Sequence, residues 1–168
     1  MEAAMSHEHE EIIEVAEGPS FHATPAHAEP TAVQQESAYG IKVWIERPYD
    51  EVLASTRKAI AHEGFGVVSD IDVRKLFQEK LGIAFPNYRI LGVCNPKWAH
   101  EALDLDKDIG LLLPCNVVVY EQSNGTVLEA VDPIAMMALA GGEGLAHLAK
   151  TVKYSLQTVI NHVSAGVD

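Results

Sequence analysis

The sequence predicts an α+β domain with one mixed or mainly antiparallel sheet of about five strands, helices packed against it, and a long C-terminal helix. Three observations support this fold class. Short apolar runs typical of strands alternate with amphipathic helical segments through the first half of the chain. Asn124 and Gly125 separate two later apolar runs and indicate an antiparallel hairpin. The final segment repeats apolar residues at helical spacing over a length that can cover a sheet.

The first elements are a strand, a helix and a second strand. Residues 39–46 alternate in polarity, which predicts a strand with one buried face. Pro48 begins the helix, where its missing N–H costs no hydrogen bond, and Gly64 ends it. Residues 65–71 form the next strand. The inward side of the helix is expected to carry Val52, Thr56, Ala59 and Ile60.

A second helix and an interior strand follow. Asp72 is a good N-cap for a helix over residues 73–81, because its carboxylate accepts hydrogen bonds from the first N–H groups. We expect Leu76 and Phe77 to anchor that helix in the core. Residues 88–93 are apolar on both faces, which indicates a strand in the interior of the sheet.

A third helix precedes the hairpin. Asn95 and Pro96 are typical of the first positions of a helix. The hairpin then joins a strand over residues 115–122 to an antiparallel strand over residues 126–131. The inward side of the third helix is expected to carry Trp98, Ala102, Leu103 and Leu105.

Two helices complete the domain. Asp132 is expected to cap a short helix over residues 134–138. The long helix covers about residues 145–163 and should lie across the sheet. Its apolar stripe consists of Leu145, Leu148, Val152, Leu156, Val159 and Val163.

The N-terminal segment differs in composition from the rest of the chain. Residues 1–37 contain eight acidic side chains and no Lys or Arg, so they carry eight of the twelve net negative charges. Recurrent proline and few aromatic residues are typical of disorder. We therefore predict an acidic, His-containing, disordered tail over residues 1–37 and a single α+β domain over residues 38–168.

Charge and hydropathy exclude several function classes. The net charge of -12 repels nucleic acid and anionic lipid, and we therefore expect neither as a partner. No apolar run approaches the roughly 20 residues that a membrane span needs. The first residues also lack the basic start of a secretory signal. We therefore expect a cytoplasmic protein whose two cysteines are reduced thiols.

Histidine is concentrated in the tail. Imidazole with carboxylate suits divalent transition metals, which makes the tail histidines candidate metal ligands. Their spacing lacks the closed pattern of a structural zinc site, and a solvated acidic tail is the alternative. His147 and His162, near the ends of the long helix, are expected to be surface or core-edge residues. The candidate ligands of the tail are His7, His9, His22 and His27.

The candidate site lies where the third strand ends and the hairpin begins. Cys94 directly precedes a helix start, whose N–H groups and dipole stabilise an anion and can lower the pKa of a thiol. Cys115 begins the next strand, so antiparallel neighbours would bring both thiols to one edge of the sheet. Asn95, Asn116 and Asp132 would lie at the same end.

Two hypotheses of function remain open. In the first, the domain is a small-ligand or thiol-dependent binding module whose thiols bind a soft metal, carry sulfur or form a reversible disulfide. In the second, it is a non-catalytic homodimeric or partner-binding domain, and the cysteines are buried core residues. The sequence contains no CxxC motif, catalytic triad or four-ligand metal motif, so it assigns no reaction and no cofactor.

Several motifs of the domain together carry a family resemblance. These motifs are Gly64-Phe65-Gly66-Val67, Asp72 with Glu79-Lys80-Leu81-Gly82, residues 88–96 (YRILGVCNP), residues 110–119 (GLLLPCNVVV) and Val131-Asp132-Pro133. With them, residues 39–163 resemble the domain-of-unknown-function 302 family, and the tail of residues 1–37 lies outside the resemblance. The resemblance implies a small cytoplasmic α+β domain that is able to dimerise, and it implies no established activity.

Overall fold

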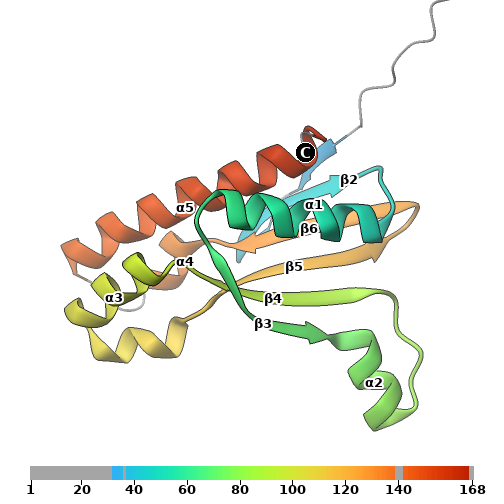
Figure 1. Cartoon of the computed structure of the whole chain (residues 1–168), viewed down its shortest axis with the longest axis horizontal. Coiled ribbons are helices and arrows are strands. Elements are labelled where there is room, and N and C mark those ends of the chain that lie inside the picture. The colour runs from blue at the N-terminus through green and yellow to red at the C-terminus, as the bar shows by residue number, and fades with distance from the viewer. Residues whose placement is uncertain (1–31, 36, 139–141, 167–168) are drawn as a thin grey trace, which may run out of the picture.

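The computed structural model describes residues 32–35, 37–138 and 142–166. These form an antiparallel sheet in the strand order β1-β2-β6-β5-β4-β3, with helices packed against it (Figure 1). The predicted α+β fold with a long C-terminal helix is confirmed. In chain order the elements are β1 (Ala32–Gln35), β2 (Gly40–Ile45), α1 (Tyr49–His62), β3 (Gly66–Asp72), α2 (Val73–Leu81), β4 (Tyr88–Cys94), α3 (Pro96–Leu105), the 3-10 helix η1 (Lys107–Leu112), β5 (Cys115–Gln122), β6 (Gly125–Val131), α4 (Pro133–Met137) and α5 (Glu143–Ser164).

Strand β1 was not predicted. Its four residues, AVQQ, fall within the predicted acidic tail, whereas the structure pairs them antiparallel with β2, with Ala32 opposite Ile45. A strand this short at a sheet edge is held mainly by backbone hydrogen bonds, so it leaves little hydrophobic periodicity to detect. The predicted disorder and metal binding of residues 1–31, including all four tail histidines, lie outside the described residues.

One face of the sheet forms the core. Helices α1 and α5 lie together on this face, and the apolar stripe predicted for each helix is buried (Figure 1). Strands β2, β4, β5 and β6 each contribute alternate residues to it, as the period of a strand requires. These residues are Val43, Ile45, Leu91, Val93, Val117, Val119, Leu128 and Ala130.

The opposite face carries an aromatic row across the strands. The register places Trp44 beside Val127, Val127 beside Tyr120, and Tyr120 beside Tyr88. The Tyr88 and Tyr120 rings are stacked with their centroids 4.9 Å apart. Val127 is fully buried although it lies outside the main core, so this row forms a second, thinner apolar layer.

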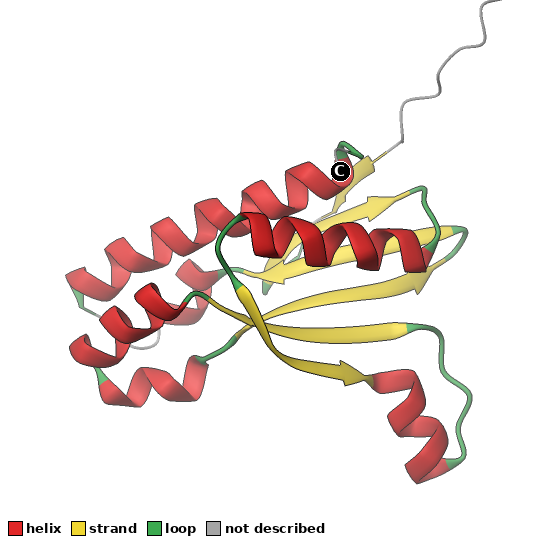
Figure 2. Ribbon diagram, viewed as in Figure 1, coloured by secondary structure: helices red, strands yellow, loops and turns green. Residues whose placement is uncertain are grey.

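Helix α2 is less buried than the sequence predicts. Leu76 is 43 % exposed, and none of the residues in this fully described helix is buried. Phe77 instead packs edge-on against Phe85, with ring centroids 5.0 Å apart. The helix predicted from the amphipathic pattern is present over Val73–Leu81. Its apolar side meets a small aromatic cluster because α2 directly follows the edge strand β3 and lies away from α1 and α5 (Figure 2).

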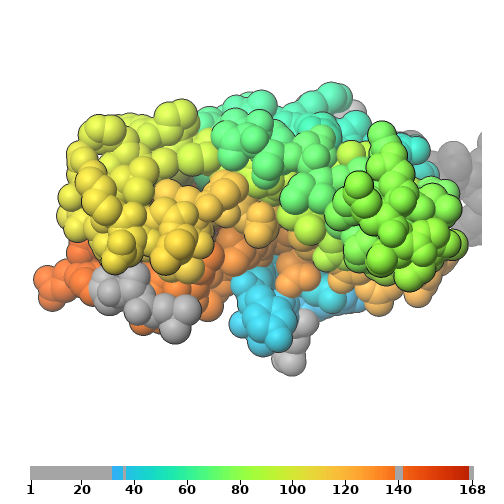
Figure 3. Space-filling view, turned by 90° about the horizontal axis from the view of Figure 1, so that it is seen from below, coloured from blue at the N-terminus to red at the C-terminus, as the bar shows by residue number. Residues whose placement is uncertain are grey.

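The two ends of the molecule differ. Figure 3 shows α2 in green at one end, with α3 and η1 in yellow at the other. At the α3 end, Trp98 and Leu103 are partly buried against the core and Ala102 is buried, whereas Leu105 is 54 % exposed, contrary to the prediction. Leu105 occupies the last position of α3, and its side chain lies beside Gly144 at the start of α5. Among the described residues, none of the helices is both long and apolar enough to cross a membrane.

Three predicted caps are present. Asp72 Oδ1 accepts from the Lys75 N–H at 2.9 Å and begins α2. Asn95 Oδ1 accepts from the Lys97 N–H at 3.1 Å and begins α3. Asp132 Oδ1 accepts from the Ile134 N–H at 2.9 Å and begins α4. These bonds satisfy N–H groups that lack partners within a helix, which explains why cap residues mark helix starts so well.

Candidate functional site

The two cysteines lie at the same end of the sheet. Strands β4 and β5 are antiparallel neighbours, and Val93 pairs with Cys115, so Cys94 lies one residue beyond that pair. Both cysteines are free thiols. The geometry that the sequence analysis expected for this pair of strands is therefore present.

Both thiols contribute to a small, mainly apolar cavity between this end of the sheet and helices α3, α4 and α5. Its free volume of about 30 Å³ has room for a species of very few heavy atoms. The lining residues are Phe65, Val93, Cys94, Asn95, Trp98, Ala99, Ala102, Leu113, Cys115, Met137, Leu148 and Val152.

Burial keeps the thiols protonated. Burial raises the pKa of the Cys94 thiol above its ordinary value. Burial, together with a smaller effect of the neighbouring Cys94, raises the pKa of Cys115 to about 11. The position of Cys94 just before α3 predicts a lowered pKa for its thiol, and the direction in the structure is opposite. The loss of hydration outweighs the helix dipole here, because desolvation penalises the charged thiolate.

A third sulfur-containing residue lines the cavity. Met137 is buried at the end of α4 and lines the cavity with Cys94 and Cys115, so three different elements supply sulfur. Sequence reasoning missed Met137. The only signal was an apolar residue on a short helix after Asp132-Pro133, and its place in the cavity lining depends on how α4 packs against α5.

Asn95 lines the cavity but its polar atoms are already used. Its Oδ1 caps α3, and its Nδ2 donates to the Gly64 carbonyl oxygen at 3.0 Å. The side chain thus ties the start of α3 to the turn between α1 and β3. Phe65, the next residue in that turn, packs edge-on against Trp98 with ring centroids 5.5 Å apart. Asn95 therefore fixes one wall of the cavity.

Asn116 and Asp132 lie apart from the cavity. Asn116 is exposed, opposite Gly92 on the other face of the sheet. Asp132 forms an ion pair with Lys153 at 2.6 Å and caps α4. Burial alone would raise the pKa of Asp132, but the hydrogen bond from Lys153, the Ile134 N–H and the Lys153 charge together lower it. Of the five candidates, the structure brings together Cys94, Asn95 and Cys115.

A separate charged cluster lies at the β3 edge of the core face. Arg89 on β4 contacts Asp70 at 3.3 Å and Asp72 at 3.1 Å, and Asp70 also contacts Arg57 at 2.5 Å. Within the described part of the chain, the buried Nε of Arg89 finds no hydrogen-bond partner. The carboxylates balance the two guanidinium groups, so this cluster ties α1 and β4 to the edge strand.

Comparison with known proteins places the chain in a family. A family model described as "Domain of unknown function DUF302" matches residues 41–163. The crystal structure of an uncharacterized conserved protein DUF302 from Bacillus stearothermophilus is similar, with a TM-score of 0.71 and 26 % sequence identity. The match covers 76 % of this chain and 99 % of that chain. No curated protein matches the sequence. The chain belongs to the DUF302 family.

Proposed function

We propose that this domain is a small-ligand binding module whose thiols hold a soft metal ion, of which monovalent copper is the best example. The observation that carries the proposal is one small cavity whose lining includes three sulfur-containing residues, Cys94, Cys115 and Met137. Thiolate and thioether ligands select soft monovalent copper over harder divalent ions. The volume of about 30 Å³ suits a single ion better than an organic cofactor.

Binding at this cavity exchanges protons for metal. Each thiol releases its proton to water as its sulfur–metal bond forms, and the Met137 thioether binds without a change in protonation. Two thiolates with one monovalent cation leave one negative charge. The N-terminal end of α3, directly after Cys94, is positioned to stabilise that charge. Cys94 is only half-buried, which gives an ion a route from solvent.

The test is anaerobic titration of the full chain with copper(I) against a chromogenic copper(I) chelator. We expect one ion per chain, with binding lost in Cys94→Ser and Cys115→Ser and weakened about tenfold in Met137→Leu. Met136→Leu is the matched control, because Met136 is the adjacent residue and does not line the cavity. Equal copper uptake by the wild type and both cysteine variants would contradict the proposal.

A second candidate function is homodimerisation through the open face of the sheet. Its apolar surface extends from the aromatic row to Val33 and Ile71, which are 48 % and 43 % exposed. On the same face Lys42 lies opposite Glu129 in the register of β2 and β6. A surface that carries both charges side by side is able to match its own copy across a two-fold axis.

Sedimentation equilibrium tests the dimer. Ile71→Glu should raise the dissociation constant at least tenfold, because it places a charge in an apolar contact. Leu111→Glu is the control, since Leu111 lies on η1 and is 88 % exposed. A wild-type chain that stays monomeric at every concentration would refute this candidate and would leave copper binding untouched.

A further inference from the structure

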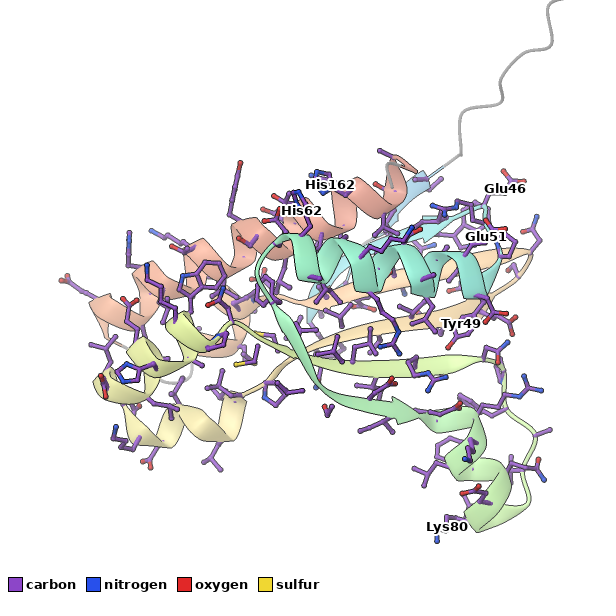
Figure 4. All side chains as sticks on the ribbon, viewed as in Figure 1. Glu46, Tyr49, Glu51, His62, Lys80 and His162 are labelled. Carbon is purple, nitrogen blue, oxygen red and sulfur yellow. The ribbon has the colours of Figure 1, made fainter. Side chains whose placement is uncertain are left out.

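The last turns of α1 and α5 bring together three side chains with metal-binding atoms. His62 ends α1, Glu63 follows it, and His162 lies in the last turn of α5. One ligand atom from each side chain lies within 4.8 Å of those of the other two. The imidazole rings are 5.7 Å apart at an angle of 72°, and Figure 4 shows them side by side where the two helices meet.

The backbone beneath these side chains is well supported. Glu63 caps the C-terminal end of α1, and its N–H donates to the Ala59 carbonyl oxygen at 3.1 Å. His162 lies between buried residues of α5, with Ile160 and Val163 each only 1 % exposed. Ligands on packed helix ends hold their relative positions better than ligands on loops. The separation of the ligand atoms is therefore a property of the packing of α1 against α5.

The local charge favours a cation. Both histidines lie at C-terminal helix ends, where the helix dipole is negative, and Glu63 adds a carboxylate. Arg47 is one cation of this region, and it donates to the Val163 carbonyl oxygen at 3.2 Å. Its Nε lies 3.7 Å from Glu51, so an acidic partner offsets its charge.

We infer that His62, Glu63 and His162 form a site for a divalent transition metal, with zinc as the best match. Two imidazoles and one carboxylate are a common three-ligand set for zinc, and they leave a fourth position open. Ligand atoms around a tetrahedral zinc ion lie about 3.3 Å apart, so a small rotation of the side chains closes the site. The His62 side chain is 74 % exposed, which leaves that fourth position facing water or an added ligand.

This site differs from the sulfur-lined cavity in both place and chemistry. Its nitrogen and oxygen donors suit zinc, cobalt or nickel, whereas sulfur donors suit monovalent copper. It comes from the ends of α1 and α5, and none of its three residues lines the cavity. No sequence motif indicates this site, because residues 62 and 162 belong to helices α1 and α5, which are far apart along the chain.

Cobalt(II) and zinc titration of the full chain tests the inference. To remove competition, the background variant carries alanine at the four tail histidines, His7, His9, His22 and His27. We expect this background to bind one cobalt ion per chain, with visible absorption bands of a tetrahedral site that zinc abolishes. His62→Ala and His162→Ala should each weaken binding about 100-fold, and Glu63→Gln about tenfold.

Two controls separate this site from other donors. His147→Ala removes a surface histidine elsewhere on α5 and should leave the affinity within about twofold. A variant with both Cys94 and Cys115 changed to serine should bind zinc as the background does. Zinc binding that survives His62→Ala and His162→Ala, or that disappears with the cysteines, overturns the inference. Circular dichroism of each variant verifies that it is folded.

Discussion

The indole of Trp44 lies directly over the backbone of Gly125. A Cβ atom added at Gly125 would lie 2.6 Å from Cζ2 of Trp44 and 2.6 Å from the Ile45 carbonyl oxygen. The Trp44 Nε1–H also donates to the Gln122 carbonyl oxygen at 3.2 Å, across the same hairpin. Gly125 is thus required by close packing between β2 and the β5–β6 turn.

Gly125→Ala should therefore destabilise the fold. Because the backbone carbonyl of Ile45 is unable to rotate away, we expect a loss of about 1–3 kcal/mol in the free energy of unfolding, measured by urea denaturation. Gly110→Ala is the matched control, since its Cβ would meet Leu103 at an ordinary 3.6 Å. If both variants lose the same free energy of unfolding, the contact with Trp44 is not the cause of the destabilisation.

The thiols should react slowly at neutral pH. With the pKa of Cys94 raised and that of Cys115 raised to about 11 by burial, the thiolate fraction of both is small at pH 7 and grows as the pH rises. Alkylation followed by mass spectrometry should show Cys94 reacting first, because it is less buried. Rapid alkylation at pH 7 in the native state, at a rate matching the urea-unfolded chain, would contradict this expectation.

Asp70 should make stability depend on acid pH. Burial alone would raise the pKa of Asp70, but hydrogen bonding and charge from Arg57, followed by Arg89, lower it in the folded state. The stabilisation is thus present at neutral pH and is lost as the pH falls through the folded-state pKa. Asp70→Asn should cost about 0.5–1 kcal/mol at pH 7, since solvent screens this partly exposed pair.

The pH profile of Asp70→Asn supplies the control. The difference in unfolding free energy between wild type and variant should shrink as both proteins are acidified. Asp108→Asn, on the exposed side of η1, should show a smaller and flatter difference. A constant difference between pH 7 and acid pH would mean that Asp70 acts through packing rather than charge.

Asp132 combines two roles that substitution can separate. Asp132→Asn keeps the cap on α4 but removes the ion pair with Lys153, which should cost about 1 kcal/mol. Asp132→Ala removes both and should cost about 1 kcal/mol more. Thermal unfolding of the two variants measures this difference. If they unfold alike, the N-terminal cap contributes nothing measurable.

Sequence reasoning was most successful where local chemistry decides structure. Asn95 and Asp132 mark helix starts because their side chains bond to N–H groups two or three residues away. The turn at residues 123–124 was predicted from Asn-Gly, although the residue with positive φ is Ser123, at 58°, and Gly125 serves packing instead. Local signals in the sequence therefore located the turn. They did not show that Gly125 is needed for close packing against Trp44.

The candidate site was predictable only in part. Adjacent antiparallel strands place Cys94 near Cys115, and that relationship follows from the hairpin and the strand pattern. Met137 and the pair of His62 with His162 depend on how helices pack, which short-range patterns do not encode. The pKa of Cys94 was predicted in the wrong direction because burial is a tertiary property that outweighs a local dipole.

The strand order has a consequence for how the chain is made. Strand β2 lies between β1 and β6, so its inner edge stays unpaired until residues 125–131 exist. Helix α5, which covers this half of the sheet, is the last element of the domain. During synthesis, the edge of β2 that faces β6 therefore stays unpaired until the hairpin and α5 have left the ribosome. Such long-range pairing slows folding, because the cost of closing the loop between the two strands comes before the contacts that reward it.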